Sequence, residues 1–137
     1  EPKLLEGQEY LDIRNSFDLT FEFWNLVKDT TLNLSLHLFS ATGECILNIA
    51  TLPKKCNDGI VTGKVSIPGN YLNDRNFTIS LMVVKEQTIV LHNFENLINF
   101  EIADYRENAA WYGKWPGYVR PNFPFTLEQT TNLKIDD

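Results

Sequence analysis

Polar and aromatic side chains alternate with apolar ones in several short runs of the sequence. In "LNLSLHLF" (32–39) the even positions are leucines, while the odd positions hold an amide, a hydroxyl, an imidazole and an aromatic ring. Sugars are bound by flat rings against their C–H faces and by paired donors and acceptors for neighbouring hydroxyls. We therefore consider these side chains and similar ones elsewhere as candidate glycan ligands: Trp24, Asn33, Ser35, His37, Phe39, Ser80 and His92. A solvated sheet face is the alternative, although such a face is usually richer in Lys and Glu.

A second group of candidates lies in "WYGKWPGYVRP" (111–121), which no helix or ordinary strand tolerates because Pro and Gly interrupt it. We predict an ordered loop here. Trp111 and Trp115 either close one end of the fold beneath the stems of Lys114 and Arg120, or line a pocket in which one of these cations meets an acidic ligand group. Both interpretations remain open at this point.

Motifs for catalysis and metal binding do not occur in the sequence. "GIVTGKV" (59–65) resembles a phosphate-binding loop, but it is one residue too short and has Val65 where the motif requires a hydroxyl. G-x-S-x-G and H-E-x-x-H are absent. His37 and His92 lie in separate predicted strands without a third ligand at a metal-binding spacing. We therefore predict a non-enzymatic chain with no catalytic residues, no metal and no cofactor of its own.

The elements that must position these side chains are strands, because apolar residues recur with period two over residues 17–23, 32–38 and 77–83. Further strands are expected at residues 10–14, 45–51, 63–67, 88–92, 97–103 and 123–129. If the first three strands are neighbours, one outer face carries most of the candidate ligands. These are Trp24, Asn33, Ser35, His37, Phe39 and Ser80, and Thr20, Glu22 and Thr78 lie beside them.

Turn residues separate the runs at 40–44, 57–59 and 68–70, and no segment has sustained helical periodicity. Many short strands at regular spacing predict an all-β fold, namely an antiparallel, immunoglobulin-like β-sandwich. A chain of 137 residues can bury a core of its own, so we expect a single domain over residues 1–137.

The composition restricts the partners. A formal net charge of −6 disfavours nucleic acid and anionic membranes. The sequence has no apolar run long enough to span a membrane and no secretion signal. Because it begins "EPKLLEG" without Met, we expect a piece of a longer protein. The cysteines Cys45 and Cys56 are expected to be free thiols of a reducing compartment, with a single bridge between them as the alternative.

Three stretches of the sequence resemble a known family. They are "FEIADYRENAAWYGKWPGYVRPNFPFTLE" (100–128), "IPGNYLNDRNFTISLMVV" (67–84) and "LHLFSATGECILNIAT" (36–51). They resemble the C-terminal domain of the ATP-binding subunits of bacterial polysaccharide ABC exporters, the Wzt-type family that moves O-antigen and related glycans. The resemblance spans residues 9–129, and the Gly-Lys-Trp-Pro-Gly stretch is its most specific part.

The resemblance implies a carbohydrate-binding β-sandwich without catalytic activity that recognises a finished polysaccharide, often by its modified end, and licenses its export. It implies an ATP-binding domain upstream in the parent protein, a transmembrane permease as partner, and a cytoplasmic location at the inner face of the bacterial inner membrane. It also implies a homodimer, formed in some members by exchange of the last strand. The run "FPFTLEQTTNLKI" (123–135) would supply that strand.

Two other classes stay open beside this interpretation. The first is a sandwich for protein–protein assembly or adhesion, in which a partner chain covers Ser35, His37 and Ser80. The second is a secreted immunoglobulin-like domain with a Cys45–Cys56 bridge.

Overall fold

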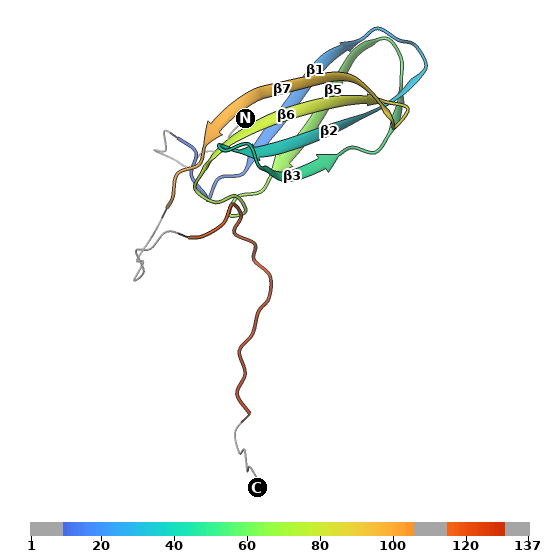
Figure 1. Cartoon of the computed structure of the whole chain (residues 1–137). Coiled ribbons are helices and arrows are strands. Elements are labelled where there is room, and N and C mark those ends of the chain that lie inside the picture. The colour runs from blue at the N-terminus through green and yellow to red at the C-terminus, as the bar shows by residue number, and fades with distance from the viewer. Residues whose placement is uncertain (1–9, 106–114, 131–137) are drawn as a thin grey trace.

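The computed structural model describes residues 10–105 and 115–130. These ranges contain β-strands and no helix, and Figure 1 shows their arrangement. The strands are β1 (Phe17–Asn25), β2 (Thr30–Ser40), β3 (Cys45–Ala50), β4 (Lys54–Cys56), β5 (Gly59–Ile67), β6 (Asn76–Lys85) and β7 (Ile89–Glu101). All pairings between them are antiparallel. The prediction of an all-β antiparallel sandwich is confirmed.

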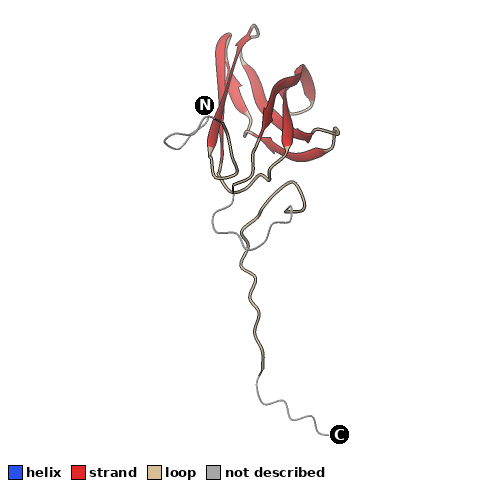
Figure 2. Ribbon diagram, turned by 90° about the vertical axis from the view of Figure 1, so that its left-hand side faces the viewer, coloured by secondary structure: helices blue, strands red, loops and turns tan. Residues whose placement is uncertain are grey.

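The strands form two layers, which are visible in Figures 1 and 2. The smaller sheet consists of β1 and β5, and the larger sheet has the order β3-β2-β6-β7, with β4 also paired to β2. β3 lies along Ser35 to Phe39 of β2, and β4 lies along Thr30 to Leu32, so together they form one edge of the larger sheet.

The core lies between the two sheets and consists of the apolar residues that the period-two pattern places on one face. Every second residue of β2 from Leu32 to Leu38 is buried, and so are Phe77, Ile79, Leu81 and Val83 of β6. The smaller sheet contributes Phe17, Leu19 and Ile67. Strand alternation in the sequence was therefore enough to identify most of the core.

The strand predictions were wrong in three places. Residues 10–14 form no strand, and Asp12 makes an isolated bridge to Ala103. The strands expected at 88–92 and 97–103 are one strand, β7, interrupted by a bulge. Residues 123–129 are extended but pair with no strand among the described residues. In this last case the pattern describes a backbone conformation, while a strand also requires a partner that a local pattern does not supply.

The segment 121–130 runs away from the sandwich, as both views show (Figures 1 and 2). Its apolar side chains are exposed, with exposed fractions of 77% for Phe123, 99% for Phe125 and 99% for Leu127. Within the described residues nothing covers them.

The alternative of a Cys45–Cys56 bridge is excluded by the sheet register. Cys45 lies opposite Phe39 and Cys56 lies opposite Thr30, at the two ends of β2. At the rise of a strand these positions are about 30 Å apart, whereas a disulfide needs Cα atoms within roughly 7 Å. Both thiols are free in the structure. The secreted immunoglobulin-like alternative therefore loses the feature on which it rested.

Gly69 is required by a close approach between two backbone segments. A Cβ atom at this position would collide with the backbone carbonyl of Arg14, and the next residue, Asn70, donates its backbone N–H to the Ile13 carbonyl at 2.6 Å. Because the obstacle is backbone, it has little freedom to move away.

We expect Gly69→Ala to lower the free energy of unfolding by about 1–3 kcal/mol, as overpacking does elsewhere. The measurement is urea unfolding followed by Trp fluorescence. Gly63→Ala is the control, because a Cβ there meets the flexible tip of Leu34 beside a cavity of about 260 Å³ between the sheets. Equal destabilisation by the two substitutions would contradict the explanation by backbone contact.

Candidate functional site

A groove of about 500 Å³ lies on the outer face of the larger sheet, over β2, β6 and β7. These three strands lie side by side (Figure 1). We call it the outer-face groove. It is lined by His37, Phe39, Ser40, Ala41, Gly43, Thr78, Ser80, Met82, Asn93, Glu95 and Asn96. Hydroxyls, amides, one imidazole and one aromatic ring therefore converge at a single place.

The β2 side of the groove presents two flat rings. Leu36 and Leu38 face the core, so His37 and Phe39 face outward. Their rings are stacked, with centroids 6.0 Å apart and planes inclined by 15°. The Nδ1 atom of His37 is buried and has no hydrogen-bond partner among the described residues.

The β7 side of the groove is built by a bulge. Ile79 pairs with Ile98 and Leu81 pairs with Phe94, so three residues of β7 (95–97) lie opposite Ser80 alone. Asn96 has a φ of 53°, a left-handed conformation that Asn tolerates better than most residues. Its backbone N–H donates to the Ser80 hydroxyl at 3.1 Å, which replaces a ladder bond that the bulge removes.

The β7 side also carries polar side chains that the sequence analysis missed. Asn93 and Glu95 both line the groove, and the Asn93 amide donates to a Glu95 carboxylate oxygen at 3.3 Å. One signal for the bulge was present in the sequence, because Asn96 stands where the alternation of Phe94 and Ile98 calls for an apolar residue. That signal alone did not specify which strand lies opposite.

The structure brings together three of the seven candidate ligands: His37, Phe39 and Ser80 line the same groove. Asn33 and Ser35 lie on the same face of β2 but do not line it, and the Ser35 hydroxyl donates to the Asn48 side chain at 2.9 Å. Ser80 itself is only 6% exposed, since the bulge covers it.

Trp24 is not part of this face, contrary to the expectation that β1 neighbours the other two strands. It lies in the smaller sheet, opposite Ile60, with 67% of its surface exposed. Thr20 and Glu22, also expected beside the candidate ligands, lie on β1 as well. Strand order in a sheet is a non-local property, which explains the error.

His92 also lies away from the groove. It pairs with the core residue Val83. Its ring stacks on the ring of Phe94, with centroids 5.5 Å apart, and Phe94 packs against the core. Directly paired residues of an antiparallel ladder point to the same side of the sheet. His92 is therefore on the core side of an edge strand, and the groove opens on the other side.

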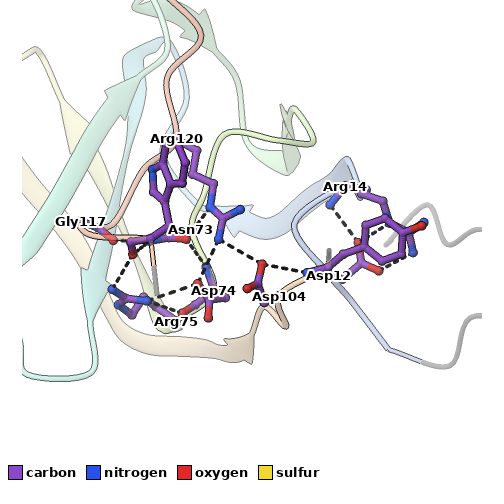
Figure 3. A network of polar contacts seen from close by, with 10 residues as sticks. Asp12, Arg14, Asn73, Asp74, Arg75, Asp104, Gly117 and Arg120 are labelled. Carbon is purple, nitrogen blue, oxygen red and sulfur yellow. Dashed lines mark hydrogen bonds and ion pairs between the residues drawn. The ribbon is translucent and has the colours of Figure 1, made fainter. Parts of the chain in front are cut away.

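The second group of candidates falls partly outside the described residues, because Trp111 and Lys114 lie in the range 106–114. The described part, Trp115 to Arg120, is held by Asn73, as Figure 3 shows. Asn73 is fully buried, and its amide donates to the carbonyls of Trp115 at 2.8 Å and Gly117 at 2.6 Å.

Arg120 completes this polar network (Figure 3). Its Nε donates to the Asn73 side-chain oxygen at 2.6 Å, and its Nη2 donates to the carboxylates of Asp74 at 3.3 Å and Asp104 at 3.1 Å. The guanidinium also lies 5.5 Å from the Trp115 ring centroid. These contacts favour the interpretation in which Arg120 packs over Trp115 and holds the loop, since its charge is already paired within the chain.

A further ion pair joins Arg14 to Asp12 (Figure 3). Asp12 is 5% exposed and accepts hydrogen bonds from the side chain of Arg14 at 2.7 and 3.0 Å. The Arg14 guanidinium lowers the pKa of the Asp12 carboxyl below its ordinary value of 3.8, although burial acts in the opposite direction. The ion pair therefore contributes stability above the ordinary pKa, and this contribution is lost as the pH falls through the lowered value.

In residues 10–105 and 115–130 no three His, Cys, Asp or Glu side chains are grouped so as to hold a metal ion. Over the same described residues no helix has the length and apolar character needed to cross a membrane.

The structure is similar to the crystal structure of the C-terminal domain of Wzt, with a TM-score of 0.63. The match covers 87% of this chain and 74% of that chain, at 11% sequence identity. No protein-family model matches the sequence, and none of the curated proteins matches it. The chain thus has the fold of the Wzt C-terminal domain, and the resemblance drawn from the sequence motifs is confirmed at the level of the fold.

Proposed function

We propose that this chain is a non-catalytic carbohydrate-binding domain that recognises a bacterial surface polysaccharide for export by an ABC transporter. The observation that carries the proposal is the outer-face groove, where two stacked rings face a row of hydroxyls and amides on a Wzt-like sandwich. These are the groups that sugars require: flat rings for C–H faces, and donors and acceptors for hydroxyls.

In this function Phe39 and His37 provide the stacking surface on β2, and Asn93 and Asn96 provide hydrogen-bonding amides on β7. Each neutral hydrogen bond contributes only about 0.5–1.5 kcal/mol net. We therefore expect weak binding of an isolated oligosaccharide. A dimer that presents two grooves to one polymer would bind more tightly by avidity.

The similarity to the Wzt C-terminal domain supports a proposal for the setting of this domain. We propose that the parent protein carries an ATP-binding domain, so that ATP is bound there and not in this chain. The parent would work at the cytoplasmic face of the bacterial inner membrane together with a transmembrane permease. Expression of the full reading frame and assay of ATP hydrolysis would test this arrangement.

We expect His37→Ala to weaken binding of the native surface polysaccharide about five- to tenfold, because it removes a ring that stacks and hydrogen-bonds. The measurement is titration of the purified protein with polysaccharide extracted from the strain that carries the gene. Trp24→Ala is the matched control, since it removes an exposed aromatic ring from the opposite sheet. Loss of binding in the control and not in His37→Ala would move the site to the smaller sheet and contradict the proposal.

We further propose that the protein is a homodimer formed by exchange of the segment 121–130. Phe123, Phe125 and Leu127 are exposed, alternate in the sequence and need a partner surface. In the described part of the chain β5 pairs with β1 alone, which leaves its other edge free. The apolar cavity between the sheets is lined partly by β5, so a strand added there would find apolar surface beside it.

The position of Pro124 agrees with this exchange. Successive residues of a strand point their N–H groups to opposite edges. If Phe123, Phe125 and Leu127 bond to the partner sheet, Pro124 points toward the open edge, where a missing N–H is tolerated.

A further inference from the structure

We propose that the outer-face groove selects uncharged sugars and rejects acidic ones, and that Glu95 is the residue that sets this preference. The inference rests on the proposed function, because it concerns what kind of glycan the same groove binds. It adds the chemical class of the ligand and a specificity-determining residue that sequence motifs did not indicate.

The first observation is the charge of the groove. Among the described residues that line it, Glu95 is the one acidic side chain, and neither Lys nor Arg is present. A uronic acid or phosphate needs a cation or a cluster of N–H donors to replace its water. An acidic sugar would instead place its charge beside the Glu95 carboxylate without compensation.

The second observation is where the cations near this sheet lie. Arg75, just before β6, is paired with Asp74 at 3.4 Å. Lys54 and Lys55 pair with the Thr31 end of β2, and Lys85 pairs with Leu32. That end is about 20 Å from His37 at the rise of a strand. Since charges are screened over about 8 Å at physiological ionic strength, these lysines do not offset Glu95 in the groove. Lys55 is moreover paired with Asp29 at 2.9 Å.

The third observation is that Glu95 is suitably placed to bind hydroxyls. The bulge holds it at the rim of the groove, and within the described residues one of its carboxylate oxygens receives a single hydrogen bond, from Asn93. The carboxylate and the neighbouring amide together offer acceptors and a donor for adjacent hydroxyls of an uncharged ring. The Glu95 carboxylate therefore favours uncharged sugars and repels acidic ones.

The test separates the native polysaccharide by anion exchange into neutral and acidic pools and titrates each with the whole protein. We expect the wild-type protein to bind the neutral pool and to bind the acidic pool more weakly. Glu95→Gln keeps the size and polarity of the side chain. It should weaken binding of the neutral pool about threefold to tenfold, because a neutral amide accepts hydroxyl hydrogen bonds less strongly than a carboxylate. It should strengthen binding of the acidic pool about five- to tenfold, as removal of one nearby like charge predicts.

The control is Glu22→Gln, which makes the same charge change on an exposed position of the opposite sheet. It should change neither titration. Raising the salt concentration should strengthen binding of the acidic pool to the wild-type protein and have little effect on Glu95→Gln. A loss of fold in Glu95→Gln would weaken binding of both pools and so is distinguishable from a change of preference.

The outcomes separate the two proposals. If the protein binds the acidic pool as well as or better than the neutral pool, or if Glu95→Gln and Glu22→Gln behave alike, the selection by charge is wrong while the proposed function stands. If the unfractionated polysaccharide does not bind, the proposed function is wrong and the selection is wrong with it.

Discussion

Replacing both Phe125 and Leu127 by Asp is expected to convert the proposed strand-exchanged dimer to a monomer. Both side chains are 99% exposed in the single chain. Burying each in a partner would contribute about 1.5–3 kcal/mol. Losing both should weaken the dimer at least about 100-fold, and two buried carboxylates would add to the effect. Sedimentation equilibrium of the wild-type and variant proteins over a range of concentrations measures the change.

The control for this prediction is Thr126→Asp, which introduces a carboxylate into the same segment on the alternate side. It should leave the dimer intact, because in an exchanged strand this side faces away from the apolar surface. A wild-type protein that is monomeric at all concentrations would refute strand exchange. Equal dissociation of the two variants would indicate that charge in the segment matters and that its alternating pattern does not.

Asn73→Ala is expected to lower the free energy of unfolding by about 3 kcal/mol or more. The Asn73 side chain makes four hydrogen bonds, donating to the carbonyls of Trp115 and Gly117 and accepting from Arg120 and from the Asp74 backbone N–H. Each buried group left without a partner costs about 1–3 kcal/mol. Removal of this one side chain therefore affects the attachment of the whole loop. Urea unfolding measures the loss.

Asn99→Ala is the matched control, since Asn99 is exposed and accepts one hydrogen bond, from Thr78 at 2.6 Å. We expect a change below about 1 kcal/mol, as for most exposed positions. Because Trp115 belongs to the network, its fluorescence should change in Asn73→Ala before global unfolding and remain unchanged in Asn99→Ala. A stable Asn73→Ala protein would mean that the loop is held chiefly by other contacts.

The candidate site shows which structural features the residue pattern of a single strand can predict. His37 and Phe39 were placed on an outer face because Leu36 and Leu38 must face the core, and this required no knowledge of other strands. Trp24 follows the same alternation in β1, yet it lies in the other sheet. Alternation decides which face of its own strand a side chain occupies, and it says nothing about which strands are neighbours.

The loop at residues 115–120 also has features that the local sequence predicts and features that depend on distant residues. The Pro and Gly residues of the sequence were sufficient to predict an ordered loop and to exclude a regular strand. They left open whether Arg120 meets a ligand or the chain itself. The structure shows it paired with Asp74 and Asp104, which lie far from it in the sequence. Partners of this kind depend on chain topology.

By itself, the sequence determined that this protein is built of strands with alternate residues buried, because the period-two pattern is a property of each segment alone. Only the tertiary structure decided that β2 and β6 lie side by side, and that three residues of β7 oppose Ser80 and carry Glu95 into the groove. The tertiary structure likewise leaves the segment 121–130 without a paired strand among residues 10–105 and 115–130. Strand order, register and bulges arise from contacts between distant segments, and the free energy of those contacts is not encoded in any one of them.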